Sequence, residues 1–240
     1  MEESTPSASK QFQDLADSAI ASGKKISFVT HVLGDSGEAK LKYLISSLLK
    51  KYDHVDHFEL LYTASRELIV NSTKAAIKRM IFQESNLNIY DSAQYNEGML
   101  RFKGLLNELK FPHYKKMMRE KGFSVKVSFV HNDRFIRMSV INNFPLLKIE
   151  ADRIREKLQH AKKFDNLFEF FLEHGDNTEG AGMGITMVEI LLMQSGFPRN
   201  TFTITSDEKE KETRATVFLP FEESLLPSDT NTEQLSIQSD

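Results

Sequence analysis

Residues 180–188 read Gly-Ala-Gly-Met-Gly-Ile-Thr-Met-Val, and this stretch decides the fold that we expect. Three glycines at alternate positions, Gly180, Gly182 and Gly184, run directly into an apolar helical pattern. Glycine lets backbone N–H groups approach a phosphate closely, and the N-terminus of a helix adds a favourable dipole. No Lys-Ser/Thr pair follows, so the stretch is not a Walker loop. On its own it predicts either a phosphate-binding loop or a flexible loop with tight helix packing.

Working outward, the next informative pair is Glu67 and Asn71, in a helical pattern over residues 57–82. Side chains four residues apart share one face of a helix. A carboxylate there can polarise a water, and an amide oxygen can ligate Mg²⁺. The same pair also fits an ordinary polar helix face, which is the favoured interpretation when the pair is taken alone.

The order of the remaining patterns predicts the fold class. Apolar runs rich in β-branched residues mark strands at 25–32, 123–130, 135–141, 201–206 and 213–219. Helical spacing of apolar residues marks helices at 36–49, 57–82, 149–174 and 184–195. Helices first, then paired strands, a helix and a closing hairpin predict a two-layer α/β sandwich.

Composition limits the kind of protein and its surroundings. Hydrophobic residues make up 40%, the net charge is −3 and cysteine is absent, which excludes disulfides and zinc-thiolate sites. The weak net charge gives no argument for nucleic acid or membrane, and neither is expected as a partner. The polar N-terminus does not look like a signal peptide, and no long apolar run is present. We therefore expect a cytoplasmic protein.

We expect one domain over residues 21–221 between two flexible ends. Residues 1–20 should be a flexible segment, because their first part is rich in Ser, Pro and Glu. Residues 222–240 are acidic and lack Lys and Arg, which predicts a disordered tail.

Taken together, four short sequence motifs, called boxes here, resemble those of the ATP-binding domain of histidine kinases. Residues 180–188 look like its G-T-G-L-G-L-A-I-V box, and residues 168–171, Phe-Glu-Phe-Phe, resemble the phenylalanine box before it. Glu67-x-x-x-Asn71 resembles the N-box of the wider superfamily of gyrase, chaperone, histidine kinase and MutL ATPases. Residues 213–220 resemble the usual G-T-x-F-x-x-x-L-P ending. All four stand in family order.

The resemblance implies a Bergerat-type sandwich, with a mixed, mostly antiparallel sheet covered by helices on one face, that binds ATP and Mg²⁺. Asn71 would hold the metal, Glu67 would activate water as the catalytic residue, and Lys74 would contact a phosphate. Residues 149–179 would form a mobile lid. In this lid His160, Lys162 and Lys163 are candidate phosphate contacts, and the alternative interpretation is that they form a solvent-exposed face.

For the remaining nucleotide contacts the resemblance implies the following. Gly180, Gly182 and Gly184 would wrap the triphosphate, and Thr213 would approach the base. Asn142 stands where the family has the Asp that accepts the adenine amino group. Asn142 can still accept a hydrogen bond, or its amide can face the O6 of guanine instead. Phe144 and Leu146 replace both glycines of the family's first glycine box, so that box is degenerate.

Residues 83–122 are a helical insertion relative to the family pattern. The segment has an apolar stripe and a basic stretch, which predicts either a satellite helix with a solvated face or a docking surface for an acidic partner or nucleic acid.

No histidine resembles a phospho-acceptor box, so an autophosphorylating sensor kinase is not expected. The leading hypothesis is a regulatory module that binds ATP·Mg and serves a protein partner in signalling, comparable to anti-sigma-factor kinases. ATPase or protein kinase activity stays open. The alternatives are a pseudo-ATPase scaffold without nucleotide, and an unrelated α/β domain.

Overall fold

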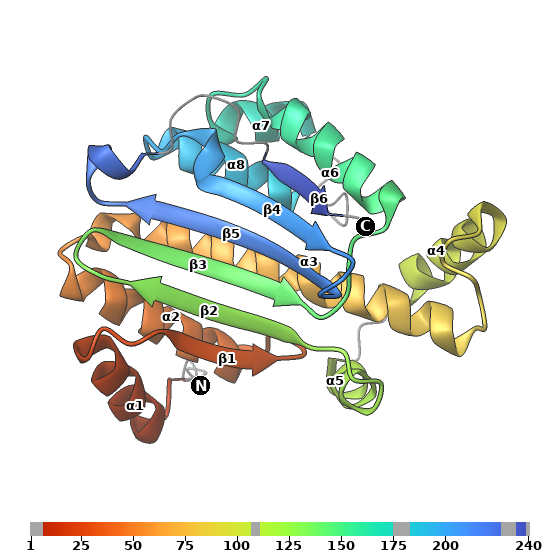
Figure 1. Cartoon of the computed structure of the whole chain (residues 1–240), viewed down its shortest axis with the longest axis horizontal. Coiled ribbons are helices and arrows are strands. Elements are labelled where there is room, and N and C mark those ends of the chain that lie inside the picture. Colours follow the sequence, from red (N-terminus) through yellow and green to blue (C-terminus); the bar gives the residue numbers. More distant parts are fainter. Residues whose placement is uncertain (1–6, 107–110, 175–182, 227–233, 239–240) are drawn as a thin grey trace, which may run out of the picture.

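Among the described residues, six strands form one open sheet, in the spatial order β1-β2-β3-β5-β4-β6 (Figure 1). The computed structural model describes residues 7–106, 111–174, 183–226 and 234–238. The strands are β1 (Ile26–Thr30), β2 (Val125–His131), β3 (Phe135–Asn142), β4 (Phe202–Asp207), β5 (Glu212–Pro220) and β6 (Leu235–Gln238). All neighbours are antiparallel except β4 and β6, which are parallel.

Alternation along the central strands separates a buried face from an outer face. Val125, Val127 and Phe129 of β2 are fully buried, while Lys126 between them is exposed. Val127 lies opposite Val140 of β3, so the buried faces of the two strands coincide. A period of two along a strand produces this result when one face packs against helices.

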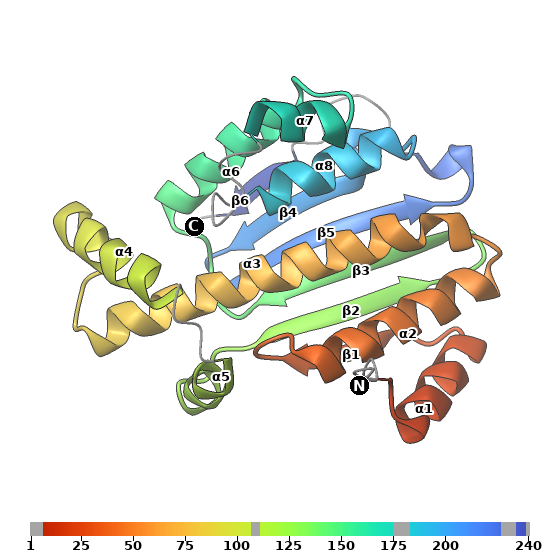
Figure 2. The same cartoon turned by 180° about the vertical axis from the view of Figure 1, so that it is seen from behind.

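Helices cover that buried face, as Figure 2 shows from behind. Four of them form the layer: α2 (Asp35–Lys51), α3 (Phe58–Glu84), α6 (Lys148–Ala161) and α8 (Gly184–Gln194). Two shorter helices flank the layer, α1 (Lys10–Ala21) beside α2 and α7 (Leu167–His174) beside α8. The predicted two-layer α/β sandwich with a mixed, mostly antiparallel sheet is therefore confirmed.

Helix α3 is the central helix of the layer, and its C-terminal end extends beyond the sheet (Figure 1). Its middle is buried on several sides, which fits its long run of apolar and small residues. The insertion after it contains α4 (Ser92–Leu106), which packs on the end of α3, and α5 (Phe111–Glu120). No described helix combines the length and apolar character needed to cross a membrane.

Both ends of the chain differ from expectation. Residues 1–20 were expected to be flexible, yet α1 covers Lys10–Ala21 and buries Ala16 and Ile20. The prediction of a disordered tail over 222–240 is wrong for Leu235–Gln238, which form β6. The physical reason is the free edge of β4, whose backbone groups pair with the tail while Leu235 enters the core. Gln234 Nε2 also donates to Glu189 Oε2 at 2.7 Å.

Candidate functional site

A cavity of about 230 Å³ lies between α3, α6 and the ends of β3 and β5. Four of the predicted site residues line it: Asn71, Lys74, Asn142 and Thr213. They come from three parts of the sequence, residues 71–74, Asn142 and Thr213, so the fold itself brings these parts together. The volume is below the range of roughly 300–1,000 Å³ that is usual for ligand pockets.

Asn71 and Lys74 reach the cavity from α3 because they lie about one turn apart on the same helix face. The Nδ2 atom of Asn71 is buried and has no hydrogen-bond partner within the described part of the chain. A buried donor without a partner is uncommon in a folded protein, and it marks a place where a ligand atom is expected.

Gly184, the first residue of α8, packs directly on the same face of α3. A Cβ atom at this position would lie 2.5 Å from Glu67 Oε2 and 2.9 Å from Asn71 Nδ2, which is closer than side chains tolerate. Only glycine therefore fits here without moving these side chains. The contact joins the third glycine of the 180–188 stretch to the Glu/Asn pair. Gly180 and Gly182 lie outside the described residues.

Asn142 and Thr213 face each other across the β3–β5 pair, and both are buried. Asn142 Nδ2 donates to the Ser72 carbonyl of α3 at 3.1 Å, and this bond settles the orientation of the amide, because only its nitrogen can donate. Asn142 can therefore offer a ligand Oδ1 as an acceptor, and the second N–H of Nδ2 remains a donor. Thr213 Oγ1 donates to the Phe144 carbonyl at 2.8 Å, so this hydroxyl holds the loop after β3.

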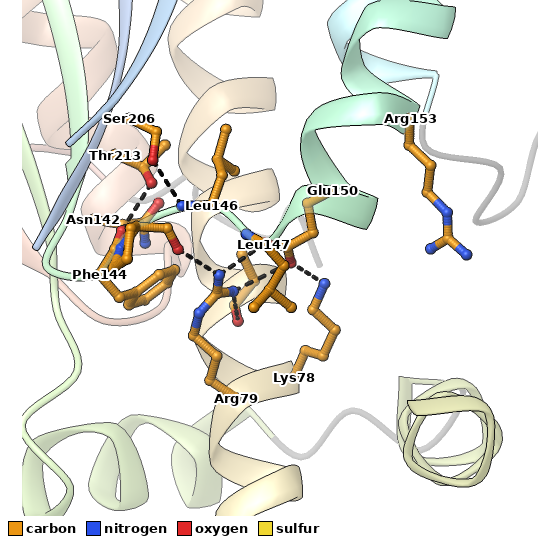
Figure 3. Close-up of polar contacts among 12 residues, drawn as sticks. Lys78, Arg79, Asn142, Phe144, Leu146, Leu147, Glu150, Arg153, Ser206 and Thr213 are labelled. Atoms are coloured by element: carbon orange, nitrogen blue, oxygen red, sulfur yellow. Dashed lines mark hydrogen bonds and ion pairs between the residues drawn. The ribbon is translucent and has the colours of Figure 1, made fainter. Parts of the chain in front are cut away.

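That loop, residues 143–147, is held by bonds from four elements (Figure 3). Leu146 N donates to Ser206 Oγ of β4 at 2.9 Å, and Arg79 Nη2 of α3 donates to the Pro145 carbonyl at 2.7 Å. The Arg79 guanidinium lies 3.9 Å from the centre of the Phe144 ring. Phe144 is thus a buried packing residue, whereas Leu146 forms part of the cavity wall.

A buried ion cluster supports the loop from the side of α6. Glu150 pairs with Lys78 and with Arg79, whose Nη2 lies 2.7 Å from Glu150 Oε2, and it accepts from Leu147 N at 3.0 Å (Figure 3). Burial alone would raise the pKa of Glu150, but the charges of Lys78 and Arg79 and these hydrogen bonds outweigh it and hold the pKa at about 2. Glu150 is therefore ionised at neutral pH.

The electrostatic character of the cavity is positive. Lys74 and Lys78 of α3 line it together with Arg153 and Lys157 of α6, while Glu150 is the one carboxylate among the described lining residues. Burial lowers the pKa of Lys157, and the charges of Arg153 and Lys74 lower it further. Cations held this close together repel each other and favour an anionic ligand.

Arg153 and Lys157 were missed from the sequence. The lid cations named there, His160, Lys162 and Lys163, are not among the described residues that line the cavity. The available signal was the four-residue spacing of Arg153 and Lys157, which puts both on one face of α6.

Apart from Ser72, the remaining lining is apolar and comes from both layers and from the insertion. It consists of Leu68 and Ala75 of α3, Met99 and Phe102 of α4, Leu146, Ile154 of α6, Ile185 of α8, Ile204 of β4 and Ala215 of β5. A cavity with an apolar side and a basic side suits a ligand that joins a planar ring to an anion.

The groups present fit a magnesium–phosphate group. Mg²⁺ prefers oxygen ligands, which the side chains of Asn71 and Glu67 supply, and it usually takes the rest from waters and phosphates. The close contact at Gly184 places the Glu67–Asn71 face of α3 against the start of α8, an 11-residue helix. Asn71 Nδ2 on this face has no partner among the described residues. Lys74 adds a cation one turn away.

Comparison with known proteins gives one curated relative. An uncharacterized protein of Treponema pallidum (strain Nichols) is 32% identical over 151 residues, which are 63% of this chain and 29% of that protein. The chain therefore spans less than a third of the relative's length. Neither a known protein family nor a solved structure gives a match to the chain.

Proposed function

We propose that the chain is a cytoplasmic regulatory module of signal transduction that binds ATP·Mg, like the catalytic domains of histidine kinases and anti-sigma-factor kinases that its boxes resemble. The observation that carries the proposal is the convergence of Asn71, Lys74, Asn142 and Thr213 on one cavity, with Gly184 packed on Glu67 and Asn71. These residues come from separate stretches of the sequence that the resemblance assigns to one nucleotide site.

In this proposal the base enters the apolar side of the cavity. Asn142 Oδ1 accepts a hydrogen bond from the adenine amino group, while Asn142 Nδ2 donates to Ser72. The O6 of guanine is an acceptor, so it would need the second N–H of Asn142 Nδ2 in place of Oδ1. The proposal assigns adenine, whose amino group matches Oδ1.

The phosphates lie on the basic side. Lys74, Arg153 and Lys157 neutralise their charge, and Asn71 holds Mg²⁺ through its amide oxygen. Bound Mg²⁺ would screen the phosphate oxygens and fix their position. Glu67, whose carboxylate lies 3.3 Å from Arg66 Nη1, is the residue that would activate water in hydrolysis.

Calorimetric titration with ATP, ADP and GTP, each with and without Mg²⁺, tests the proposal. We expect Mg²⁺-dependent binding of ATP in the micromolar range, weaker binding of GTP, and loss of the Mg²⁺ dependence in Asn71→Ala. Asn96→Ala, an exposed asparagine of α4, is the matched control and should bind as the unaltered protein does. Unaltered binding by Asn71→Ala would refute the metal assignment.

A pseudo-ATPase scaffold is the second candidate, and the loop after β3 favours it. Phe144 and Leu147 are buried, the loop is pinned by hydrogen bonds, and the cavity of about 230 Å³ is small. In this case a partner protein would bind the insertion, where Leu100 is 73% exposed and Tyr90 81% exposed. A flat titration of folded protein with every nucleotide would select this candidate.

A further inference from the structure

A second group of metal-binding side chains lies at the other end of α3. It consists of His54, Asp56 and His57, in and just before the short 3-10 helix η1 (Val55–His57). One ligand atom from each of the three residues lies within 4.8 Å of the other two. The Nδ1 of His57 is 3.6 Å from Asp56 Oδ2. The proposed nucleotide chemistry makes no use of these residues.

Aromatic packing fixes the two imidazole rings. The rings of His54 and His57 are nearly parallel, at 9° and with centroids 5.8 Å apart. His54 stacks on Phe221 with centroids 3.8 Å apart, and His57 meets Phe197 edge-on at 5.1 Å. Rings that are already ordered lose little conformational entropy when they ligate an ion.

From this arrangement we infer that His54, Asp56 and His57 form a binding site for a divalent transition metal of the zinc class. Two imidazole nitrogens and one carboxylate oxygen are the donors that zinc, nickel and copper accept, whereas Mg²⁺ prefers oxygen alone. Three protein ligands leave a fourth position of a tetrahedral site for water.

Only a small movement is needed to close the site. Ligand atoms in a tetrahedral zinc site lie roughly 3.3 Å apart when the bonds are ~2.0–2.1 Å long. The Asp56 side chain is 71% exposed and can rotate toward the rings.

The site is separate from the nucleotide cavity. From residue 57 to residue 71 the rise along α3 is about 21 Å. The packing partners Phe197 and Phe221 follow α8 and β5 in the chain, so these two elements hold the rings, whereas all three ligands come from residues 54–57.

Titration of the full chain, free of any histidine tag, with Zn²⁺ and with Co²⁺ tests the inference. We expect one equivalent of Zn²⁺ to bind, Co²⁺ to give the visible absorption of a tetrahedral nitrogen–oxygen site, and excess Mg²⁺ not to compete. His54→Gln, Asp56→Asn and His57→Gln should each weaken binding about tenfold or more. His113→Gln, an exposed histidine of α5, is the control and should bind normally.

Absence of Zn²⁺ binding, or binding that none of the three substitutions weakens, would overturn the inference. His57→Gln disturbs the contact with Phe197, so Asp56→Asn, at an exposed position, decides the matter if that variant unfolds. Neither outcome depends on whether ATP binds.

Discussion

Gly184 shows how a single residue determines the geometry of the site. In Gly184→Ala the new methyl group meets the ends of the Glu67 and Asn71 side chains, which must then move away. We expect the fold to persist and Mg²⁺-dependent ATP affinity to fall about tenfold, equal to ~1.4 kcal/mol, in calorimetric titration.

Gly104→Ala is the matched control for this substitution. Gly104 lies in α4, and an added Cβ would meet nothing within 4 Å. Alanine there should leave nucleotide binding unchanged and stabilise the helix by about 0.5–1 kcal/mol. Equal ATP affinity in Gly184→Ala and the unaltered protein would show that the Glu67–Asn71 face does not hold the ligand.

For single residues, the sequence was informative where the spacing of residues indicated a helix. The Glu67/Asn71 pair and Gly184 could be placed on helices from periodicity alone, and the structure brings them into contact. The orientation of the Asn142 amide could not be predicted, because it depends on the Ser72 carbonyl of a distant helix. The proposed contact between Asn142 and adenine therefore draws on the structure.

Among the elements, α6 joins the loop after β3 to α3 through Glu150. Its folded pKa of about 2 lies below the ordinary value of 4.5. The ion cluster therefore contributes its full stability above pH 4.5, and this contribution is lost as the pH falls toward 2. The shift of Glu150 alone corresponds to about 3 kcal/mol, and the burial of Lys78, which lowers the pKa of that lysine, opposes it.

Glu150→Gln removes the charge and leaves Lys78 and Arg79 buried without their counter-ion. We expect a loss of about 3 kcal/mol or more in the free energy of unfolding at pH 7, measured with urea. The difference between this variant and the unaltered protein should shrink below pH 4.5. Glu156→Gln, an exposed position of the same helix, should behave like the unaltered protein. A difference that does not change with pH would contradict the ionised state of Glu150.

Helix α6 also carries the proposed phosphate contacts Arg153 and Lys157. We expect Arg153→Ala and Lys157→Ala each to weaken ATP binding about tenfold, because a charged hydrogen bond contributes ~1.5–3 kcal/mol. Adenosine binding, measured in the same calorimeter, should not change. Arg155→Ala is the control, since Arg155 pairs with Asp152 at 2.8 Å on an exposed face. Equal losses for ATP and adenosine would argue against phosphate contacts.

The position of Arg153 and Lys157 at the cavity could not be predicted from the sequence, for a physical reason. Residues 148–163 hold many charged side chains, and a helix pattern alone does not say which face meets another charged helix. The insertion is a similar case, because its helical content was predictable whereas the contact of Met99 and Phe102 with the cavity depends on how α4 folds back on α3.

For the molecule as a whole, the predicted order of helices and strands was enough to predict a two-layer sandwich. The sixth strand was missed because residues 222–240 are polar and carry few apolar residues. Its pairing partner, β4, supplies the missing information. An edge strand pairs through its backbone groups, which are the same in almost every residue. Its composition can therefore resemble that of a disordered segment.

Leu235→Ala tests whether the tail belongs to the folded sheet. Leu235 is 5% exposed and packs in the main core, so its loss should cost about 2 kcal/mol or more in urea unfolding. Ser236→Ala, the next residue of β6, should have little effect. Unchanged stability in Leu235→Ala would mean that β6 does not contribute to the core.

The central claim, that ATP·Mg occupies the cavity between α3, α6 and the ends of β3 and β5, is tested most directly by hydrogen exchange with and without saturating ATP·Mg. The account predicts slower exchange in peptides that cover residues 68–78, 142–147 and 150–157, and no change over β1 and β2. Exchange that stays the same in all three peptides, or that slows only elsewhere, would contradict it.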